Sequence, residues 1–235
     1  MMNGSIEYNG RSIEYHARLT GRKTLAISVH PNGDVEVVAP DGTSKAVIEE
    51  RLQRRASWIL QQRRYFDQFQ PRTPKRRFVG GETHLYLGRQ YRLKIIEGGI
   101  DSVKLKGGHF LVTTTGRPTS NYVGTLLAAW YRIHGDAKLN ERFAAVTQRY
   151  ARVLAVTPTL AIRPMQRRWG SFSSRGRVTL NPDLVRAPVP CIDYVIVHEL
   201  AHARHPNHGR AFFHLLGQMM PDWERRKGAL ERMLA

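Results

Sequence analysis

The chain is poor in cysteine and has no long hydrophobic run. Cys191 is the single cysteine among 235 residues, so neither an internal disulfide nor a cysteine-based zinc site can form, which fits a reducing cytosol. No stretch of about 18 apolar residues is present, which excludes a transmembrane helix. The first residues are polar and charged and lack the apolar core of a signal peptide. We therefore expect a cytoplasmic protein without a membrane partner.

Acidic residues are also scarce relative to basic ones. Lys and Arg together number 37 against 19 Asp and Glu, which gives a net charge of +18 and a pI near 10.8. Such an imbalance favours a polyanionic partner, namely DNA, RNA or a nucleotide. The hydrophobic fraction of 41% is ordinary for a globular protein, and the length suits one large domain or two small ones.

Many of the basic residues fall in one segment. A helix is predicted there from an N-cap at Ser44 to about Phe69, with Trp58 among the aromatic residues between its arginines. A basic surface with aromatic residues can follow phosphates and stack bases, whereas a solvated helix face is the alternative interpretation. The residues predicted to contact nucleic acid are Arg51, Arg54, Arg55, Arg63, Arg64, Arg72, Lys75, Arg76 and Arg77.

Hydrophobic periodicity places strands in the first half of the chain and helices in the second. Alternating residues around Asn9-Gly10 and around residues 31–34 predict hairpins, and residues 78–115 alternate again. The later elements are expected as a helix from an Asn121 cap to about Leu154, a strand at 160–164, a polar loop at 167–174, a strand from Arg177 to Asn181-Pro182, and helices from Ile192 and after Gly209, the last broken near Pro221. This order indicates an α+β fold.

The same order suggests two regions. Residues 1–118 are expected to form a β-rich region with the basic helix, and residues 119–235 are expected to form the catalytic domain. The two can also pack as one unit.

His-Glu-Leu-Ala-His at residues 198–202 is the motif that carries chemistry. Residues four apart project from the same side of a helix, so His198 and His202 can bind one metal ion. Glu199 then lies beside the water that such an ion holds. This H-E-x-x-H pattern is typical of zinc hydrolases, with two histidine ligands and a glutamate as general base. The alternatives are a chance histidine-rich helix and a structural zinc site, which would need four protein ligands.

A catalytic zinc ion needs a third protein ligand and an open position for water. Pro206 ends the helix soon after His202, which lets the next loop bring His208 back toward the motif. The spacing from His202 to His208 equals that of the longer motif H-E-x-x-H-x-x-G-x-x-H. His205 stands where that motif has glycine, so the turn must differ in geometry. We favour His208 as the third ligand, and the alternatives are His205, Asp222 and Glu224.

One zinc ion in such a site lowers the pKa of its water toward about 7, and Glu199 takes a proton from that water as it attacks. The metal polarises the carbonyl or phosphoryl oxygen under attack. A further donor to the developing oxyanion is expected, and the candidates are Tyr194, Arg167 and Arg168.

Several runs in the C-terminal third occur together. They are Arg168-Trp-Gly-Ser171, the strand up to Asn181, Tyr194-Val195, the His-Glu-Leu-x-His core, Asn207-His208, Phe212 and Met220-Pro-Asp-Trp223. With these runs, residues 160–225 resemble the YgjP-like metal-dependent hydrolases, a zincin group of the minigluzincin kind related to SprT-like and WLM proteases. The resemblance implies a zincin-like helical metallopeptidase core with a short sheet bordering the cleft.

The resemblance also implies roles for individual residues. It places zinc ligands on His198, His202 and His208 and the catalytic glutamate on Glu199, and it implies that the strand from Val178 to Leu180 is an edge strand that can hold an extended peptide. Phe172 departs from the family, which usually has cysteine there, so a thiol role is not expected. The predicted substrate contacts are Arg167, Arg168, Trp169, Val178, Leu180 and Tyr194, with a core anchor as the alternative role for Trp169.

Three functions compete at this point. The first is a zinc metallopeptidase acting on proteins or peptides, with nucleic acid nearby. The second is a nucleotide phosphohydrolase or pyrophosphatase, because arginine side chains suit phosphate oxygens and several precede the motif: Arg163, Arg167, Arg168, Arg175 and Arg177. The third is a non-enzymatic nucleic-acid-binding protein whose metal only stabilises the fold. The motif and the resemblance favour the metallopeptidase.

Overall fold

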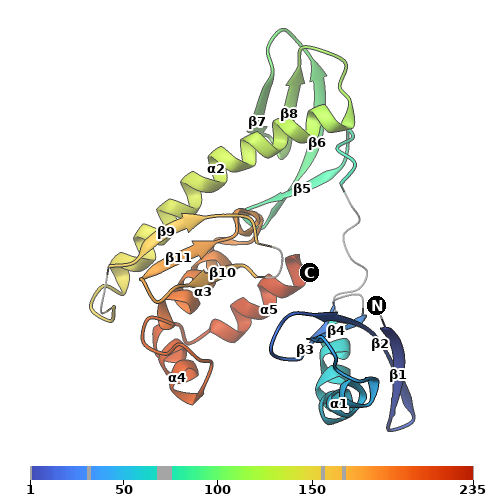
Figure 1. Ribbon diagram of the computed structural model, residues 1–235. Helices are drawn as coiled ribbons and strands as arrows, with labels where there is room; N and C mark the ends of the chain where they lie inside the picture. The colour runs from blue at the N-terminus through green and yellow to red at the C-terminus, as the bar shows by residue number, and fades with distance from the viewer. Residues whose placement is uncertain (1, 31–32, 68–75, 155–156, 166–167, 235) are drawn as a thin grey trace. The chain divides into compact units, whose positions relative to one another are not determined.

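The computed structural model describes residues 2–30, 33–67, 76–154, 157–165 and 168–234. The chain divides into two compact units, residues 1–73 and residues 74–234 (Figure 1). The first unit has one sheet, one helix and one core, whereas the second has two sheets, several helices and two buried clusters, and each unit is described by itself.

The first unit is a four-stranded sheet with one helix. Its elements are β1 (Met2–Tyr8), β2 (Arg11–Thr20), β3 (Ala26–Val29), β4 (Val35–Pro40) and α1 (Lys45–Asp67), and the strand order is β1-β2-β4-β3. Asn9 and Gly10 have φ angles of 48° and 70°, as a tight two-residue hairpin turn requires. Strands β3 and β4 pair antiparallel. Both predicted hairpins are therefore confirmed.

Helix α1 covers one face of this sheet through a single apolar stripe. Ser44 Oγ lies 3.5 Å from the backbone nitrogen of Val47, which agrees with the predicted N-cap. Ile48, Leu52 and Ile59 are fully buried against sheet residues that include Val37. The opposite side of the helix carries its charged residues, as expected for an amphipathic helix.

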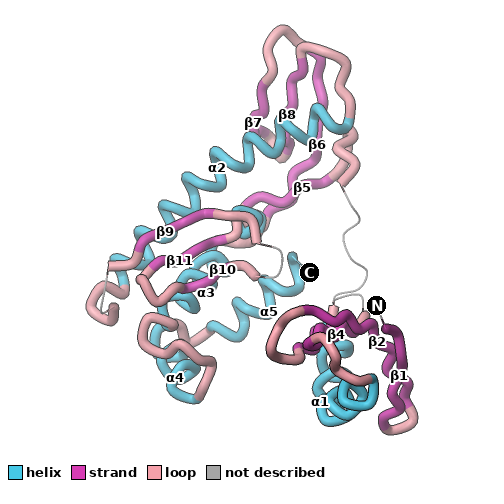
Figure 2. The backbone as a smooth tube through the Cα atoms, in the orientation of Figure 1, coloured by secondary structure: helices cyan, strands magenta, loops and turns pink. Residues whose placement is uncertain are grey.

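The second unit begins with another four-stranded sheet. Its strands are β5 (Thr83–Tyr86), β6 (Arg89–Glu97), β7 (Ser102–Lys106) and β8 (His109–Thr114), in the order β5-β6-β8-β7. Leu93, Phe110 and Val112 point from this sheet into a core shared with Leu127 and Trp130 of the long helix α2 (Ser120–Arg149). Figure 2 shows α2 running past this sheet and on toward a second, smaller one.

Helix α2 begins earlier than predicted. Thr119, not Asn121, is its N-cap, because Thr119 has an extended backbone and its hydroxyl accepts a hydrogen bond from the Tyr122 nitrogen at 3.3 Å. The helix ends at Arg149, short of the predicted Leu154, and residues 150–153 form turns instead.

The smaller sheet and the last helices complete the unit. They are β9 (Thr159–Ile162), β10 (Gly170–Phe172), β11 (Arg177–Leu180), the 3₁₀ helix η1 (Pro182–Arg186), α3 (Val189–Ala201), α4 (Arg210–Met219) and α5 (Trp223–Leu234). The predicted break near Pro221 is confirmed, because α4 ends before it and α5 starts after it. The predicted polar loop at 167–174 instead contains β10, which pairs antiparallel with β11.

The strand order of this sheet corrects one expectation. It is β10-β11-β9, so the strand from Val178 to Leu180 is the central strand, with β10 antiparallel on one side and β9 parallel on the other. The prediction of an edge strand there is wrong, and β10 takes that position.

The mixed α+β fold is as predicted, with most strands ahead of most helices. Along the sequence, the boundary between the two compact units falls between residues 73 and 74, whereas the expected division of regions lies between residues 118 and 119, inside the second unit. That division stays a prediction about where the catalytic domain begins. No helix within the described ranges is both long and apolar enough to span a membrane.

Candidate metal centre and active-site cavity

Helix α3 presents the first two histidines. It is rich in buried apolar residues, which include Ile192, Ile196 and Leu200, so its position is set by the core around it. His198 lies in its last turn and His202 is its C-cap. The centres of their rings lie 5.1 Å apart, as the four-residue helical spacing predicts.

The loop after α3 brings back the third histidine. His208 lies just before α4, and its Nε2 is 3.0 Å from Nε2 of His198. Its ring centre is 4.6 Å from that of His202. One nitrogen of each of the three side chains lies within 4.8 Å of the others, which makes this cluster a candidate metal site.

The alternative third ligands lie elsewhere. His205 contributes its backbone oxygen, which accepts a hydrogen bond from Nδ1 of His202 at 3.0 Å. Asp222 is paired with Arg225 at 2.7 Å and with Arg226 at 2.9 Å. Glu224 begins α5 and is not part of the histidine cluster.

Phe212 packs against all three histidines. Its ring centre is 5.0 Å from that of His198, 4.6 Å from that of His202 and 4.7 Å from that of His208, and its side chain is fully buried. Phe212 is one of the residues that carry the resemblance to the YgjP-like hydrolases. The H-E-x-x-H motif did not predict that it packs against the three imidazoles. Its spacing of four residues after His208, across the start of a helix, is the available signal.

The protonation of the imidazoles suits a metal. Burial and the neighbouring histidines lower the pKa of His198 to about 4, and burial with His202 lowers the pKa of His208, so both are neutral near pH 7. His202 Nδ1 is engaged by the His205 carbonyl, which leaves Nε2 facing the cluster. Two nitrogens bound at about 2.0–2.1 Å by a tetrahedral zinc ion lie about 3.3 Å apart, close to the 3.0 Å between His198 and His208. The three side chains therefore fit a zinc ion.

Glu199 is buried beside this cluster. Its side chain is largely removed from solvent, and burial raises its pKa to about 7 against a weaker opposite effect of Arg168. Gly170 on β10 makes room for it, because a Cβ at Gly170 would lie 2.7 Å from the Glu199 Oε1 atom. The carboxylate therefore lies between the histidine cluster and the edge strand of the sheet.

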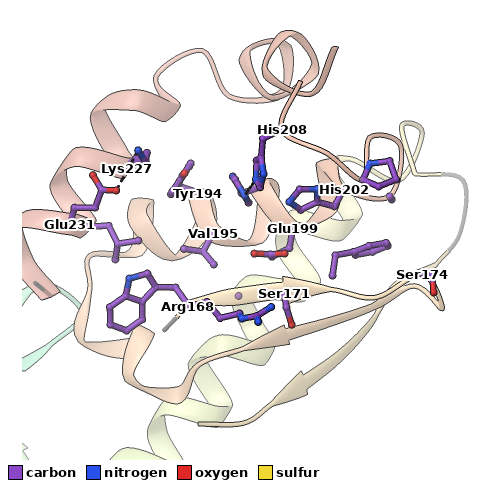
Figure 3. Close-up of a pocket in the computed structure, with 17 residues that line it drawn as sticks. Arg168, Ser171, Ser174, Tyr194, Val195, Glu199, His202, His208, Lys227 and Glu231 are labelled. Atoms are coloured by element: carbon purple, nitrogen blue, oxygen red, sulfur yellow. Dashed lines mark hydrogen bonds and ion pairs between the residues drawn. The ribbon is translucent and has the colours of Figure 1, made fainter. Parts of the chain in front are cut away.

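A cavity of about 760 Å³ contains all four groups (Figure 3). Strand β10 forms one wall, where Gly170, Ser171 and Phe172 line the cavity. Lys227, Leu230 and Glu231 of α5 line another part, and Lys227 Nζ lies 3.4 Å from Glu231 Oε1. None of these residues was predicted to line the site, although Gly170 and Ser171 belong to the run Arg168-Trp-Gly-Ser171; the residues of α5 have no local signal, because only the tertiary fold brings them to the motif.

The register of β10 directs hydrogen-bonding groups into this cavity. Trp169 accepts a hydrogen bond from Asn181 and Ser173 donates one to Arg177, both at 2.9 Å, so alternate residues face β11. The backbone N–H and C=O groups of Gly170 and Phe172 consequently point away from β11, along the edge that lines the cavity.

Three of the predicted substrate contacts line the cavity: Arg168, Trp169 and Tyr194. Trp169 also packs against the core, as the core-anchor alternative expects, and its contact with substrate stays a prediction. Val178 and Leu180 are fully buried in the core and do not line the cavity. Arg167 lies outside the described residues.

The predicted nucleic-acid contacts are distributed over both compact units. Arg51 and Arg55 line a cavity of the first unit, while Arg54 pairs with Glu50 and Arg63 donates to backbone oxygens. Arg64 is exposed on the same helix. Arg76 and Arg77 belong to the second unit, and Arg72 and Lys75 lie outside the described residues.

Comparison with known proteins gives a family. Two crystal structures of metallopeptidase zymogens are similar to the chain. Abylysin of Pyrococcus abyssi has 21% identity and a TM-score of 0.34 over 39% of this chain and 87% of that chain. Jannalysin of Methanocaldococcus jannaschii has 20% identity and a TM-score of 0.36 over 41% of this chain and 97% of that chain. No curated protein matches. The sequence pattern of the YgjP-like metallopeptidase domain matches residues 23–233, so the chain belongs to the YgjP-like metallopeptidases, a family of metal-dependent hydrolases.

Proposed function

We propose that the protein is a peptidase that uses one zinc ion held by His198, His202 and His208, with Glu199 as general base. The observation that carries this proposal is the convergence of the three imidazoles, a buried carboxylate and a free strand edge on one cavity. Membership of the metallopeptidase family supports the same reaction class.

Each residue of the site has a separate role in the proposed hydrolysis. When bound, the zinc ion polarises the substrate carbonyl and acidifies a water molecule. Glu199 accepts a proton from the water as its oxygen attacks the carbonyl carbon, and then passes that proton to the leaving nitrogen as the C–N bond breaks. The His205 carbonyl keeps Nε2 of His202 available for the metal.

The shape of the cavity favours an extended peptide as substrate. The outward N–H and C=O groups of Gly170 and Phe172 can pair with a peptide backbone as an added strand. Arg168 and Tyr194 line the same cavity and can donate to the developing oxyanion. Burial raises the pKa of Tyr194 well above its usual range, so its hydroxyl keeps its proton near neutral pH.

Phosphate chemistry is less well supported. Of the four upstream arginines that the structure describes, Arg163, Arg168, Arg175 and Arg177, only Arg168 lines the cavity. A diphosphate carries several charges and needs several cationic donors. The strand edge, in contrast, offers groups that match a peptide.

Replacing Glu199 by Gln tests the proposal. We expect the purified wild-type protein to contain one zinc per chain and to cleave peptides from a quenched fluorescent library. Glu199→Gln should keep the zinc but lose activity by about a hundredfold or more. Glu141→Gln, at an exposed carboxylate on α2 that pairs with Lys138, is the matched control and should retain activity.

Two results would contradict the proposal. One is release of phosphate from a nucleotide panel with the same dependence on Glu199 and without peptide cleavage. The other is a Glu199→Gln protein that cleaves peptides as fast as the wild type. We further propose, as a separate part, that the peptidase acts in the cytoplasm and near nucleic acid, which the net charge of +18 supports.

A further inference from the structure

A second cavity lies in the first unit, between the edge strand of its sheet and α1. Its volume is about 600 Å³, and it is lined by residues 23–27 on and before β3 together with Arg51, Arg55 and Trp58 on α1. All of these residues belong to residues 1–73, so this cavity is distinct from the metal centre. We refer to it as the β3–α1 groove.

The rim of the groove carries cations without carboxylate partners. Lys23, Arg51 and Arg55 are exposed and make no ion pair within the described ranges. Other cations of this unit are engaged: Lys45 lies 3.6 Å from Glu49, Arg54 lies 2.5 Å from Glu50, and Arg18 lies 3.0 Å from Glu36. Three side chains that carry a positive charge without an ion-pair partner in the described part of the chain are therefore gathered at the β3–α1 groove.

The floor of the groove is apolar and includes an aromatic ring. Leu25, Ile27 and Trp58 are half-buried, and each packs against the core of the first unit while lining the groove. Arg51, Arg55 and Trp58 are spaced by four and three residues, so they lie along one side of α1. Trp58 and the two arginines therefore line the groove from the same side of the helix.

The edge of β3 adds a backbone donor. This strand is the outermost in the order β1-β2-β4-β3. The His30 nitrogen donates to the Asp34 oxygen at 2.7 Å, which sets the register so that Ser28 and Ala26 face β4. The N–H of Ile27 therefore points away from the sheet, at the edge that lines the groove.

We propose that the β3–α1 groove binds single-stranded nucleic acid. The phosphates contact Lys23, Arg51 and Arg55, and an unpaired base stacks on Trp58. Positive rims with aromatic floors are the common solution for single strands, because every base has an aromatic face. In a duplex the aromatic faces of the bases are stacked on one another, so they cannot contact the apolar floor of the groove. The proposal concerns binding by the first unit and is independent of the chemistry at His198, His202 and His208.

Binding of a fluorescent fifteen-residue oligothymidylate to the full-length protein tests the proposal. The triple variant Lys23→Gln/Arg51→Gln/Arg55→Gln should weaken binding strongly at low salt. It should also reduce the slope of log K against log salt by about 2, since each phosphate contact on a single strand contributes about 0.7. Cleavage of small peptides should be unchanged in this variant, so a failure here and a failure of the proposed peptidase activity can be told apart.

Stacking on Trp58 has its own readout. Trp58→Leu should weaken binding of the oligothymidylate by about tenfold, but it should leave binding of an abasic strand of equal length unchanged. A merely misfolded variant would lose both strands equally, and thermal unfolding of Trp58→Leu identifies that case. If a folded Trp58→Leu protein binds the oligothymidylate and the abasic strand more weakly by the same factor, Trp58 does not stack on a base.

A charge-matched variant separates a site from general attraction. Lys94, Lys104 and Lys106 are exposed on β6 and β7 of the second unit, and replacing all three by Gln removes the same charge as the groove variant. We expect a much smaller effect. The proposal is overturned if both triple variants weaken binding equally, or if duplex DNA, a polyglutamate peptide or anionic vesicles bind more tightly than the single strand.

Discussion

The absence of a side chain at Gly170 makes room for the Glu199 carboxylate. Its position in β10 brings the backbone beside Glu199, and an added Cβ would come within 2.7 Å of both Cγ and Oε1 of that residue. The Arg-Trp-Gly-Ser run therefore has a physical reason for its glycine: the edge strand and the buried carboxylate occupy neighbouring positions.

Gly170→Ala should damage catalysis more than folding. The new methyl group displaces the Glu199 carboxylate, and a misplacement of about 1 Å can reduce the rate about a hundredfold. The measurements are kcat/KM on a peptide substrate and the zinc content, which should stay at that of the wild type. Gly217→Ala is the control, because nothing lies within 4 Å of its added Cβ, and an alanine inside a helix stabilises by about 0.5–1 kcal/mol. Wild-type activity in Gly170→Ala would show that the carboxylate has room to move.

Glu82 gives a prediction about pH. Burial alone would raise its pKa, but backbone N–H groups of Arg77 and Phe78, at 2.9 and 2.7 Å, lower it below 4.5. A carboxyl whose pKa is lower in the folded state stabilises the fold above its ordinary pKa, and this contribution is lost as the pH falls through the folded value. His84 is the neighbouring titratable group, with Nε2 3.2 Å from Glu82 Oε2.

Glu82→Gln should consequently be less stable than the wild type by about 1–2 kcal/mol near neutral pH. The difference should shrink as the pH falls through the lowered pKa of the wild-type carboxyl, because the carboxyl is then protonated. Urea unfolding of both proteins across this range measures it. A difference that stays constant with pH would mean that the charge of Glu82 contributes nothing.

At the residue scale, the sequence predicts those parts of the site that lie close together along the chain. The four-residue spacing brought His198 and His202 together, and the turn after Pro206 favoured His208 over His205, as the cluster in the structure has it. It could not find Ser171 or Lys227, because these residues reach the cavity through tertiary packing. It also could not reveal that Val178 and Leu180 lie on a central strand with a neighbour on each side, since an apolar alternating strand looks the same at the centre or the edge of a sheet.

At the scale of elements, an ion pair connects the long helix to the motif helix. Arg142 of α2 donates from Nε and a terminal nitrogen to the two carboxylate oxygens of Asp193 of α3, each at 2.9 Å. Both side chains are largely shielded from solvent. A bidentate pair of this kind fixes orientation as well as distance, so it helps to position the helix that carries His198 and His202.

A double-mutant cycle measures this connection. Arg142→Met and Asp193→Asn should each destabilise the protein, and the coupling energy should be about 1–3 kcal/mol. Each single variant should also bind zinc more weakly, because α3 loses one of its restraints. The pair Arg54 and Glu50, exposed on α1, is the control, and its coupling should be below about 1 kcal/mol. Additive effects for Arg142 and Asp193 would refute the positioning role.

Long helices and strands were predicted correctly more often than short ones. Helices α1, α2, α3 and α4 follow from periodicity and turn residues, whereas the three-residue β10 was hidden in a segment with the composition of a loop. The hairpin between β5 and β6 shows a further limit. Leu87 adopts a φ of 50°, unusual for leucine, and its nitrogen donates to Val185 at 2.9 Å while its side chain packs into the main core. Such a turn is stabilised by distant contacts that no local pattern records.

At the scale of the whole molecule, the cores are separate. One buried cluster lies within residues 1–73, and the two others lie within residues 74–234. The sheet of β5 to β8 shares its core with α2, so the second unit needs those strands to cover Leu127 and Trp130.

Fragments test this division. A chain of residues 74–235 should unfold cooperatively, bind zinc and cleave small peptides, but it should lose the single-strand binding assigned to the β3–α1 groove. A chain of residues 119–235 should aggregate or unfold more readily, because the apolar side of α2 is uncovered. Calorimetry, zinc analysis and peptide cleavage distinguish the two fragments. A stable, active fragment 119–235 would instead support the division predicted at residues 118 and 119.

The proximity of β10 to Glu199 has a consequence for selectivity. In the proposed mode of binding, a peptide that pairs with Gly170 and Phe172 engages the same short strand that leaves room for Glu199, the proposed proton acceptor. A peptide whose backbone pairs fully with β10 holds this strand in place and so keeps the Glu199 carboxylate in position. A poorly matched segment can still enter the cavity, yet it leaves the acceptor misaligned. Discrimination between sequences would then be seen mainly in turnover, with little difference in how tightly competing peptides are held.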